Sequence, residues 1–158
     1  MNTIEVQTRD FGTVVLEELK TIKFVEPIFG FEEYDEFVLL SESEFGEGIL
    51  WLQSLEEPDL CFIITDPRLT YPDYHPELTP GVKEKLSSKG IKDPVFWTIA
   101  VLREEFANST INLKSPVLID SETRYAAQVI LEGDYPIRAP LMPQEGGAQD
   151  AGLDKEKR

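Results

Sequence analysis

The sequence is poor in the side chains from which most catalytic and metal sites are built. Its 158 residues include one cysteine, Cys61, and one histidine, His75. A single cysteine forms no intramolecular disulfide, so a secreted fold held by disulfides is not expected. A zinc site would need carboxylates in place of the usual ligands, and a Ser-His-Asp or Cys-His system would have to use His75, in a proline-rich loop. We therefore expect no catalytic residue, no metal site and no cofactor.

Phosphate-binding and membrane-associated segments are also missing. Neither G-x-x-x-x-G-K-[ST] nor G-x-G-x-x-G occurs, so the glycine-rich loops that bind phosphate are absent from the sequence. No apolar run approaches the ~18 residues that span a membrane. The first residues have neither the basic nor the apolar region of a signal peptide. These features indicate a cytoplasmic protein without membrane contact.

Positive charge is scarce, with 15 basic against 30 acidic residues and a net charge of −15. Residues 144–158 hold four acids and three bases, which leaves −14 on the rest of the chain. Such a field repels nucleic acid and anionic membranes and attracts basic partners. Solubility alone is the alternative explanation of the charge. On either interpretation, direct binding of nucleic acid is not expected.

Short strands dominate the prediction for residues 2–143. Many short β-branched and aromatic runs at regular spacing indicate an all-β domain, either a small barrel or a sandwich. Trp51 and Trp97 lie inside apolar runs and are expected to be largely buried, and the run 95–102 is expected to be buried on both faces. The predicted strands are 13–16, 36–40, 49–55, 60–65, 95–102, 109–113, 117–119 and 126–131.

One helix and one tail complete the prediction. Thr79 is a candidate N-cap, Pro80 suits the first helical position, and Gly90 suits a left-handed C-terminal cap. We expect one short helix packed over an open face or edge of the barrel. Residues 144–158 are small and polar, which predicts a disordered C-terminal tail and a domain of residues 2–143.

Two segments mix aromatic residues with charge or proline. Residues 24–34 combine large apolar groups with Pro27, Gly30 and acids, and residues 66–74 are rich in proline and tyrosine. Aromatic residues dominate interface hot spots, so both segments are candidate protein-binding surfaces. A plug over the end of the barrel is the alternative, and both roles can hold together. The partner-binding candidates are Glu26, Phe29, Gly30, Phe31, Glu32, Glu33, Tyr71 and Tyr74.

Two other function classes were weighed from the acidic residues. A small carboxylate-based hydrolase would use paired acids such as Glu56 and Glu57, assisted by His75 or Tyr74. With 30 acids in the chain, however, adjacent pairs are expected by chance. An acidic nucleic-acid mimic that inhibits a basic protein would need acids evenly spaced along one face, whereas here they are scattered over predicted turns.

The ordered phrases of the chain resemble the FliW family over about the whole of residues 2–143. Within residues 24–32, Gly30-Phe31-Glu32 keeps the family phrase F-P-x-G-I-P-G-F-E, while Pro27 replaces its first glycine and Phe29 its second proline. Each phrase is weak alone, but the set occurs in the family's order. The other matching phrases are Phe11–Val14, Phe37–Leu40, Trp51–Ser54, Phe62–Pro67, Tyr71–Tyr74, Asn112–Ile119 and Ala126–Leu131.

This resemblance implies a flagellar assembly factor that is not an enzyme. It implies a small β-barrel adaptor, or chaperone, that binds flagellin in the cytoplasm. Once flagellin has been exported, the freed protein is expected to bind CsrA, a translational repressor, and to relieve repression of flagellin synthesis. CsrA binds RNA and so carries basic surface, which fits the acidic composition of this chain.

Overall fold

The computed structural model describes residues 2–17, 20–42, 44, 46 and 48–143. Regular structure there is mainly β, which confirms the expected class, and α2 is the predicted short helix. The elements are β1 (Thr3–Gln7), β2 (Thr13–Glu17), β3 (Thr21–Glu26), β4 (Glu36–Leu40), β5 (Ile49–Ser54), β6 (Cys61–Thr65), α1 (Pro67–Thr70), α2 (Pro80–Ser88), β7 (Val95–Val101), the 3-10 turn η3 (Phe106–Asn108), β8 (Thr110–Ile111), β9 (Val117–Ile119), β10 (Tyr125–Gln128) and β11 (Ala139–Pro140).

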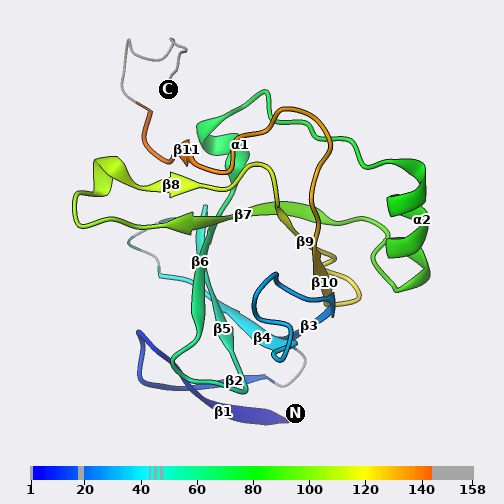
Figure 1. Cartoon of the computed structure of the whole chain (residues 1–158). Coiled ribbons are helices and arrows are strands. Elements are labelled where there is room, and N and C mark those ends of the chain that lie inside the picture. Colours follow the sequence, from blue (N-terminus) through cyan, green and yellow to red (C-terminus); the bar gives the residue numbers. More distant parts are fainter. Residues whose placement is uncertain (1, 18–19, 43, 45, 47, 144–158) are drawn as a thin grey trace.

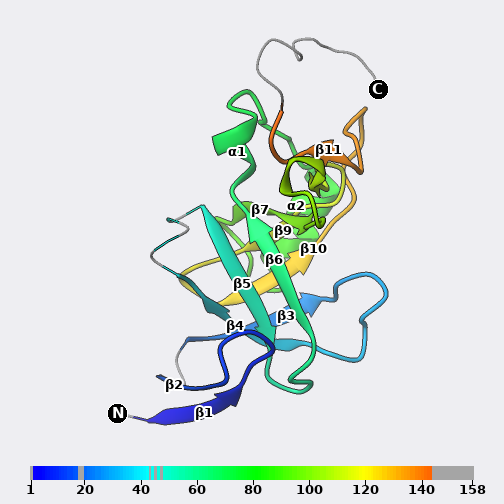
Figure 2. The same cartoon turned by 90° about the vertical axis from the view of Figure 1, so that its left-hand side faces the viewer.

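Seven strands close into a barrel-like ring. The strand order is β7-β6-β5-β4-β3-β10-β9, and β9 pairs with β7 to complete the circle. Within the ring β10 and β3 run parallel, while the other neighbours are antiparallel. Beside the ring, β8 pairs with β7 and β11 pairs with β8 (Figures 1 and 2). Closure gives each ring strand a neighbour on both sides and so protects its backbone from edge-to-edge pairing.

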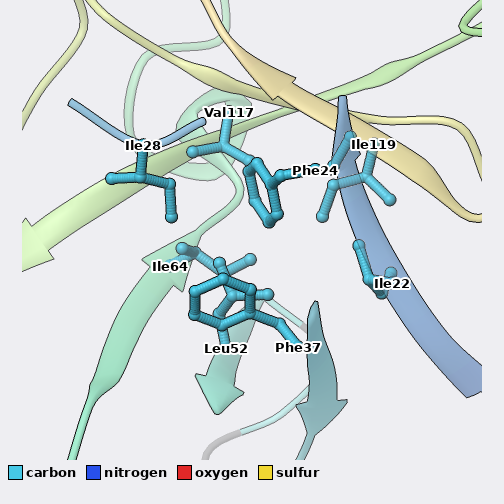
Figure 3. Packing of buried hydrophobic residues seen from close by; sticks show 9 residues of the cluster. Ile22, Phe24, Ile28, Phe37, Leu52, Ile64, Val117 and Ile119 are labelled. Carbon is cyan, nitrogen blue, oxygen red and sulfur yellow. The ribbon is translucent and has the colours of Figure 1, made fainter. Parts of the chain in front are cut away.

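The ring encloses an apolar core to which most of its strands contribute. Figure 3 shows Phe24 and Phe37 directed toward each other, and their rings meet edge to face with centroids 5.2 Å apart. Ile28, which follows β3, points into the same space. The buried members of this cluster are Ile22, Phe24, Ile28, Phe37, Leu52, Ile64, Val117, Ile119 and Ala126.

Alternation along the strands creates two further clusters outside the ring. Ile64 lies in the ring core, but its neighbour Ile63 belongs to a cluster formed with residues near α1 and β11. Leu118 and Ala127 likewise lie outside the ring and pack with Leu86 of α2. The side-chain period of two in a strand therefore supplies both the barrel core and the surfaces on which the helices and loops rest.

The signals at both ends of α2 act as the sequence predicts. The hydroxyl of Thr79 accepts a hydrogen bond from the backbone N–H of Val82 at 3.3 Å, and Pro80 begins the helix. At the other end Gly90 has φ +97°, and the N–H of Ile91 donates to the carbonyl of Leu86 at 2.9 Å. This Schellman closure turns the chain toward β7.

The β1–β2 hairpin lies outside the ring and is attached by two partly buried hydrogen bonds from Arg9 and by one aromatic contact. The backbone N–H of Arg9 donates to Oε1 of Gln53 at 2.9 Å, and the Arg9 guanidinium donates to the carbonyl of Cys61 at 2.8 Å. Phe11 packs edge to face against Trp51, with centroids 5.1 Å apart. The sequence analysis missed β1, although its residues alternate strictly between polar and apolar types.

One expectation needs correction, one is met and one falls outside the described residues. Val95 and Val101, at the two ends of β7, are exposed, so this strand is not buried along its whole length. Trp51 and Trp97 keep only a minor part of their surface exposed, in line with the expected burial. The predicted tail, residues 144–158, lies outside the described residues. In the part of the chain that the structure describes, no helix is long and apolar enough to cross a membrane.

Candidate functional site

The loop between β3 and β4, residues 27–35, divides its apolar side chains between the core and the surface. Ile28 is buried, and Phe31 packs edge to face on Phe62 with centroids 5.1 Å apart. Phe29 lies between them and is 46% exposed. The loop therefore closes part of the core, as the alternative of a plug expects, and it also leaves one aromatic ring exposed. Figure 2 shows the loop projecting from the end of β3.

Hydrogen bonds hold this loop in one conformation. The N–H of Phe29 donates to Oε1 of Gln128 at 2.8 Å, and the amide of Gln128 donates in turn to the carbonyl of Ser115 at 3.0 Å. Gly30 has φ +89°, a left-handed value that favours glycine. Its N–H donates to the carboxylate of Glu32 at 2.9 Å, which lowers the pKa of Glu32. The exposed Phe29 ring is thus carried on a backbone that is already ordered.

Acidic residues surround the loop because the β5–β6 turn lies against it. Oε1 of Glu56 accepts hydrogen bonds from the N–H groups of Asp35 and Glu36, at 2.9 and 3.2 Å. These bonds place the turn beside the loop. Lys23 lies 3.7 Å from Asp35 and offsets one of the charges. We define the acidic loop surface as the exposed residues Phe29, Glu32, Glu33, Glu36, Glu56 and Asp59.

Glu26 is the last residue of β3, and its side chain contacts α2 rather than the exposed part of the loop. Its carboxylate pairs with the ammonium of Lys89 and lies 3.6 Å from that of Lys85, both on the α2 side. The Lys89 hydrogen bond lowers the pKa of Glu26. Its charge is therefore engaged within the protein and fastens α2 to the end of β3.

Tyr71 and Tyr74 are not brought together with the acidic loop surface. They follow α1 and contribute to the cluster near β11, whereas Ile28 and Phe31 belong to the ring core. The Tyr74 hydroxyl donates to the carbonyl of Leu113 at 2.8 Å, and its ring is 6% exposed. Tyr71 donates to the carbonyl of Pro140 at 2.6 Å, and burial raises its pKa to about 12. Buried in this way, Tyr74 presents no surface to a partner.

Sequence reasoning missed the residues that order the loop. The sequence places Gln128 in an apolar strand and Glu56 in an acid pair at a turn, and it indicates no role for either residue in the loop. A glutamine inside a buried strand needs hydrogen-bond partners, and that requirement is the signal which could have singled out Gln128. The bonds of Glu56 to two loop amides give it a structural role that needs no catalysis.

The single histidine and the single cysteine lie in different environments. His75 is exposed, while Cys61 is buried and desolvation raises its pKa to about 11, so the thiol stays protonated near neutral pH. Across the described ranges, no three His, Cys, Asp or Glu side chains are grouped so that they could hold a metal ion. The acidic loop surface is suited to binding, with an aromatic anchor bordered by charge.

Comparison with known proteins gives a consistent result. The family model described as FliW protein matches residues 5–141. A flagellar assembly factor FliW of Exiguobacterium sp. is 39% identical over 86% of this chain and 93% of its own length. One from Caldanaerobacter subterraneus subsp. tengcongensis is 34% identical over 89% of this chain and 95% of its own length.

A solved structure extends the likeness to the fold. The crystal structure of the flagellar assembly factor FliW superposes with a TM-score of 0.78 at 29% identity, covering 90% of this chain and 99% of that one. Sequence, family model and fold thus agree over nearly the whole described domain. The chain belongs to the FliW family of flagellar assembly factors.

Proposed function

We propose that the chain is a cytoplasmic, non-enzymatic adaptor that binds flagellin and, when free of it, binds and antagonises a CsrA-type translational regulator. Membership of a flagellar assembly family supports a role in which other proteins are the ligands. The observation that carries the proposal is the acidic loop surface, where an exposed aromatic ring stands on an ordered loop among five exposed carboxylates.

Electrostatics favours the regulator as one partner. A protein that binds RNA presents basic surface, and complementary charge raises the rate of association and suppresses wrong partners. The same negative field opposes the approach of RNA phosphate. An acidic adaptor seated on the regulator would therefore disfavour RNA binding whether it covers the RNA site or lies beside it.

Apolar contact favours flagellin as the other partner. Phe29 is a large exposed ring whose backbone is already fixed, so binding through it loses little conformational entropy. Because Phe29, Glu32 and Glu33 share one loop, a partner that covers the ring also covers these two charges. We propose that the two partners therefore exclude one another.

Reversal of a single charge tests the proposal. Glu33 is exposed, and the described residues contain no hydrogen-bond or ion-pair partner for its side chain, whereas Glu32 holds Gly30. Glu33→Lys therefore changes the charge without disturbing the loop. Glu132→Lys makes the same change at an exposed site on the segment after β10, away from the loop. Association and dissociation rates for CsrA and for flagellin would be measured at several salt concentrations.

Glu33→Lys should slow CsrA association several-fold at low salt, and Glu132→Lys should slow it much less. Exposed charges are screened over ~8 Å at physiological ionic strength, so CsrA association should slow as salt is added. Flagellin binding, which we attribute to the apolar Phe29 ring, should depend less on salt. Equal small effects of both variants would show that only the diffuse field matters. Absence of binding to both partners from the same organism, measured by calorimetry at low salt, would reject the proposed function.

A further inference from the structure

An apolar hollow lies apart from the acidic loop surface, among α1, η3 and the residues that follow β11. Its volume is about 340 Å³, and its apolar lining includes Leu69, Phe106, Leu141 and Met142. Leu69 is 71% exposed, Met142 52% and Phe106 46%. Three large apolar side chains thus stand in solvent around one concave surface, an arrangement that marks interaction sites.

The hollow is built by local contacts that hold Leu69 outward. Asp66 caps α1 by accepting a hydrogen bond from the N–H of Arg68 at 3.0 Å. The side chain of Leu69 lies over Gly48, where an added Cβ would come within 2.2 Å of Leu69 Cδ1. Glycine at position 48 therefore permits the observed position of the leucine.

The far wall of the hollow is fixed through its backbone. The N–H of Leu141 donates to the carbonyl of Ser109 at 2.8 Å, and the Thr70 hydroxyl donates to the carbonyl of Leu141 at 3.4 Å. The carbonyl of Pro140 is engaged by Tyr71. Because these backbone groups already have partners, the wall offers side chains to a ligand and no free strand edge. A helix, which binds a groove through side chains, fits this surface better than an added strand.

Charge identifies the kind of helix. Glu104 and Glu105 directly precede Phe106 in an exposed turn, and Asp66, which lines the hollow, is paired with Arg68 at 3.3 Å. The chain as a whole carries a net charge of −15, so a second copy and an anionic membrane would both be repelled. A helix with apolar residues on one face and basic residues beside them would be attracted.

We propose that this hollow binds a basic amphipathic helix of a protein partner, through Leu69, Phe106 and Met142. The hollow would be a second binding surface beside the acidic loop surface. It rests on the proposed function in one respect, namely that the ligand is a protein. Apolar side chains at helical spacing enter the hollow, and flanking lysine or arginine side chains meet its acidic border.

Methionine labelling provides a direct test with a defined probe. The sequence has two methionines, so a ¹³C-methyl label places one reporter, Met142, at the hollow and the other at Met1. The probe is a synthetic 18-residue helix with leucine on one face and lysine on the other. A matched peptide with glutamate in place of lysine is the charge control. Titrations use the full chain and two variants, Leu69→Ser and Val15→Ser, which each remove one exposed apolar side chain.

The Leu/Lys helix should shift the Met142 signal saturably, and the Leu/Glu helix should not at the same concentration. Leu69→Ser should weaken binding about tenfold, in line with the loss of roughly one buried leucine contact. Val15→Ser, on the distant β1–β2 hairpin, should leave binding unchanged. Equal affinity of the wild-type and Leu69→Ser chains, or no shift at Met142, would overturn the proposal.

Two further results would assign the hollow to another occupant and so also overturn the proposal. A Met142 signal that moves with protein concentration alone would indicate a second copy of the chain. Helix binding that becomes much tighter when residues 146–158 are removed would indicate that the chain's own C-terminal segment occupies the hollow. None of these measurements uses flagellin or CsrA, so the outcome is separate from that of the proposed function.

Discussion

The backbone N–H of Phe29 donates a hydrogen bond to Oε1 of Gln128 over 2.8 Å, although the two residues are 99 positions apart. Gln128 lies in β10, which pairs in parallel with β3, the strand that leads into the loop. The only parallel pairing within the described ring thus brings a buried amide to the base of the loop. This contact couples the closure of the barrel to the presentation of Phe29.

Replacement of Gln128 should therefore loosen the loop and lower stability together. Gln128→Ala leaves the N–H of Phe29 and the carbonyl of Ser115 without their partner, and each unsatisfied buried group costs about 1–3 kcal/mol. We expect a loss of at least about 2 kcal/mol in the free energy of urea unfolding. Gln7→Ala, which removes an exposed side-chain bond to Thr13, is the control and should change stability by less than about 0.5 kcal/mol. Similar stabilities for the two variants would show that Gln128 does not anchor the loop.

Asp120 should make stability depend on pH in the acidic range. Its buried carboxylate accepts hydrogen bonds from the N–H groups of Lys92, Asp93, Glu122 and Thr123, and these bonds, that from Lys92 foremost, lower its pKa. Since the folded state then holds the proton less tightly than the unfolded state, the stabilisation is complete above the ordinary Asp pKa of about 4. It is lost as pH falls through the lower folded value.

The measurement for Asp120 is the stability difference between the wild type and Asp120→Asn. Hydrogen bonds to a charged group contribute about 1.5–3 kcal/mol, so the difference at pH 7 should be at least about 2 kcal/mol. It should shrink at pH 3 or below, because the wild-type carboxyl becomes protonated. Asp134→Asn, at an exposed site, serves as the control. A difference that stays constant across this pH range would contradict the assigned role.

Two glycines of the α2 region should respond to alanine in opposite directions. Gly90 has φ +97°, and an added Cβ would lie 2.5 Å from the Tyr125 ring, so Gly90→Ala should lower stability by about 2 kcal/mol. Gly81 lies within the first turn of α2 with open space around it, and Gly81→Ala should raise stability by up to about 1 kcal/mol. Melting temperatures measured by circular dichroism would shift down for the first variant and up for the second. A shift in the same direction for both would contradict this interpretation.

The sequence predicts most of the features that depend on local patterns, and it misses those that depend on long-range strand pairing. The caps of α2 were found because Thr79, Pro80 and Gly90 act within one or two turns of the helix. The turn α1 was missed, although Asp66 followed by Pro67 is an N-terminal helix signal. Strand β3 was partly read as loop, because its pairing with β10 joins residues about 100 positions apart. No local pattern reports such a contact.

The candidate site shows the same division. Composition marked residues 24–34 as unusual, and the structure places Phe29, Glu32 and Glu33 of that segment at the surface. Composition could not distinguish these exposed residues from Tyr74, which is buried by packing with Leu113 and Tyr135. The hollow around Leu69 also escaped prediction, since it is assembled from four segments that are distant in sequence.

The neighbouring apolar residues of the loop allow binding to be separated from folding. Phe29 is 46% exposed, whereas Ile28 is 2% exposed. Substitution of each residue with alanine removes most of its side chain, so the two variants can be compared. Phe29→Ala should change the free energy of unfolding by less than about 1 kcal/mol, as is usual for surface positions. Ile28→Ala leaves a cavity beside Phe24 and Val117 and should cost about 2–5 kcal/mol.

Flagellin binding should show the reverse order, because an exposed aromatic anchor dominates an interface while a buried residue only supports it. Phe29→Ala should weaken binding at least tenfold at a temperature where every variant is folded, as checked by circular dichroism. Ile28→Val, which keeps the core filled, should leave binding close to that of the wild type. Normal flagellin binding by Phe29→Ala would show that the loop serves the barrel alone, and flagellin would then have to engage another surface, such as the hollow around Leu69.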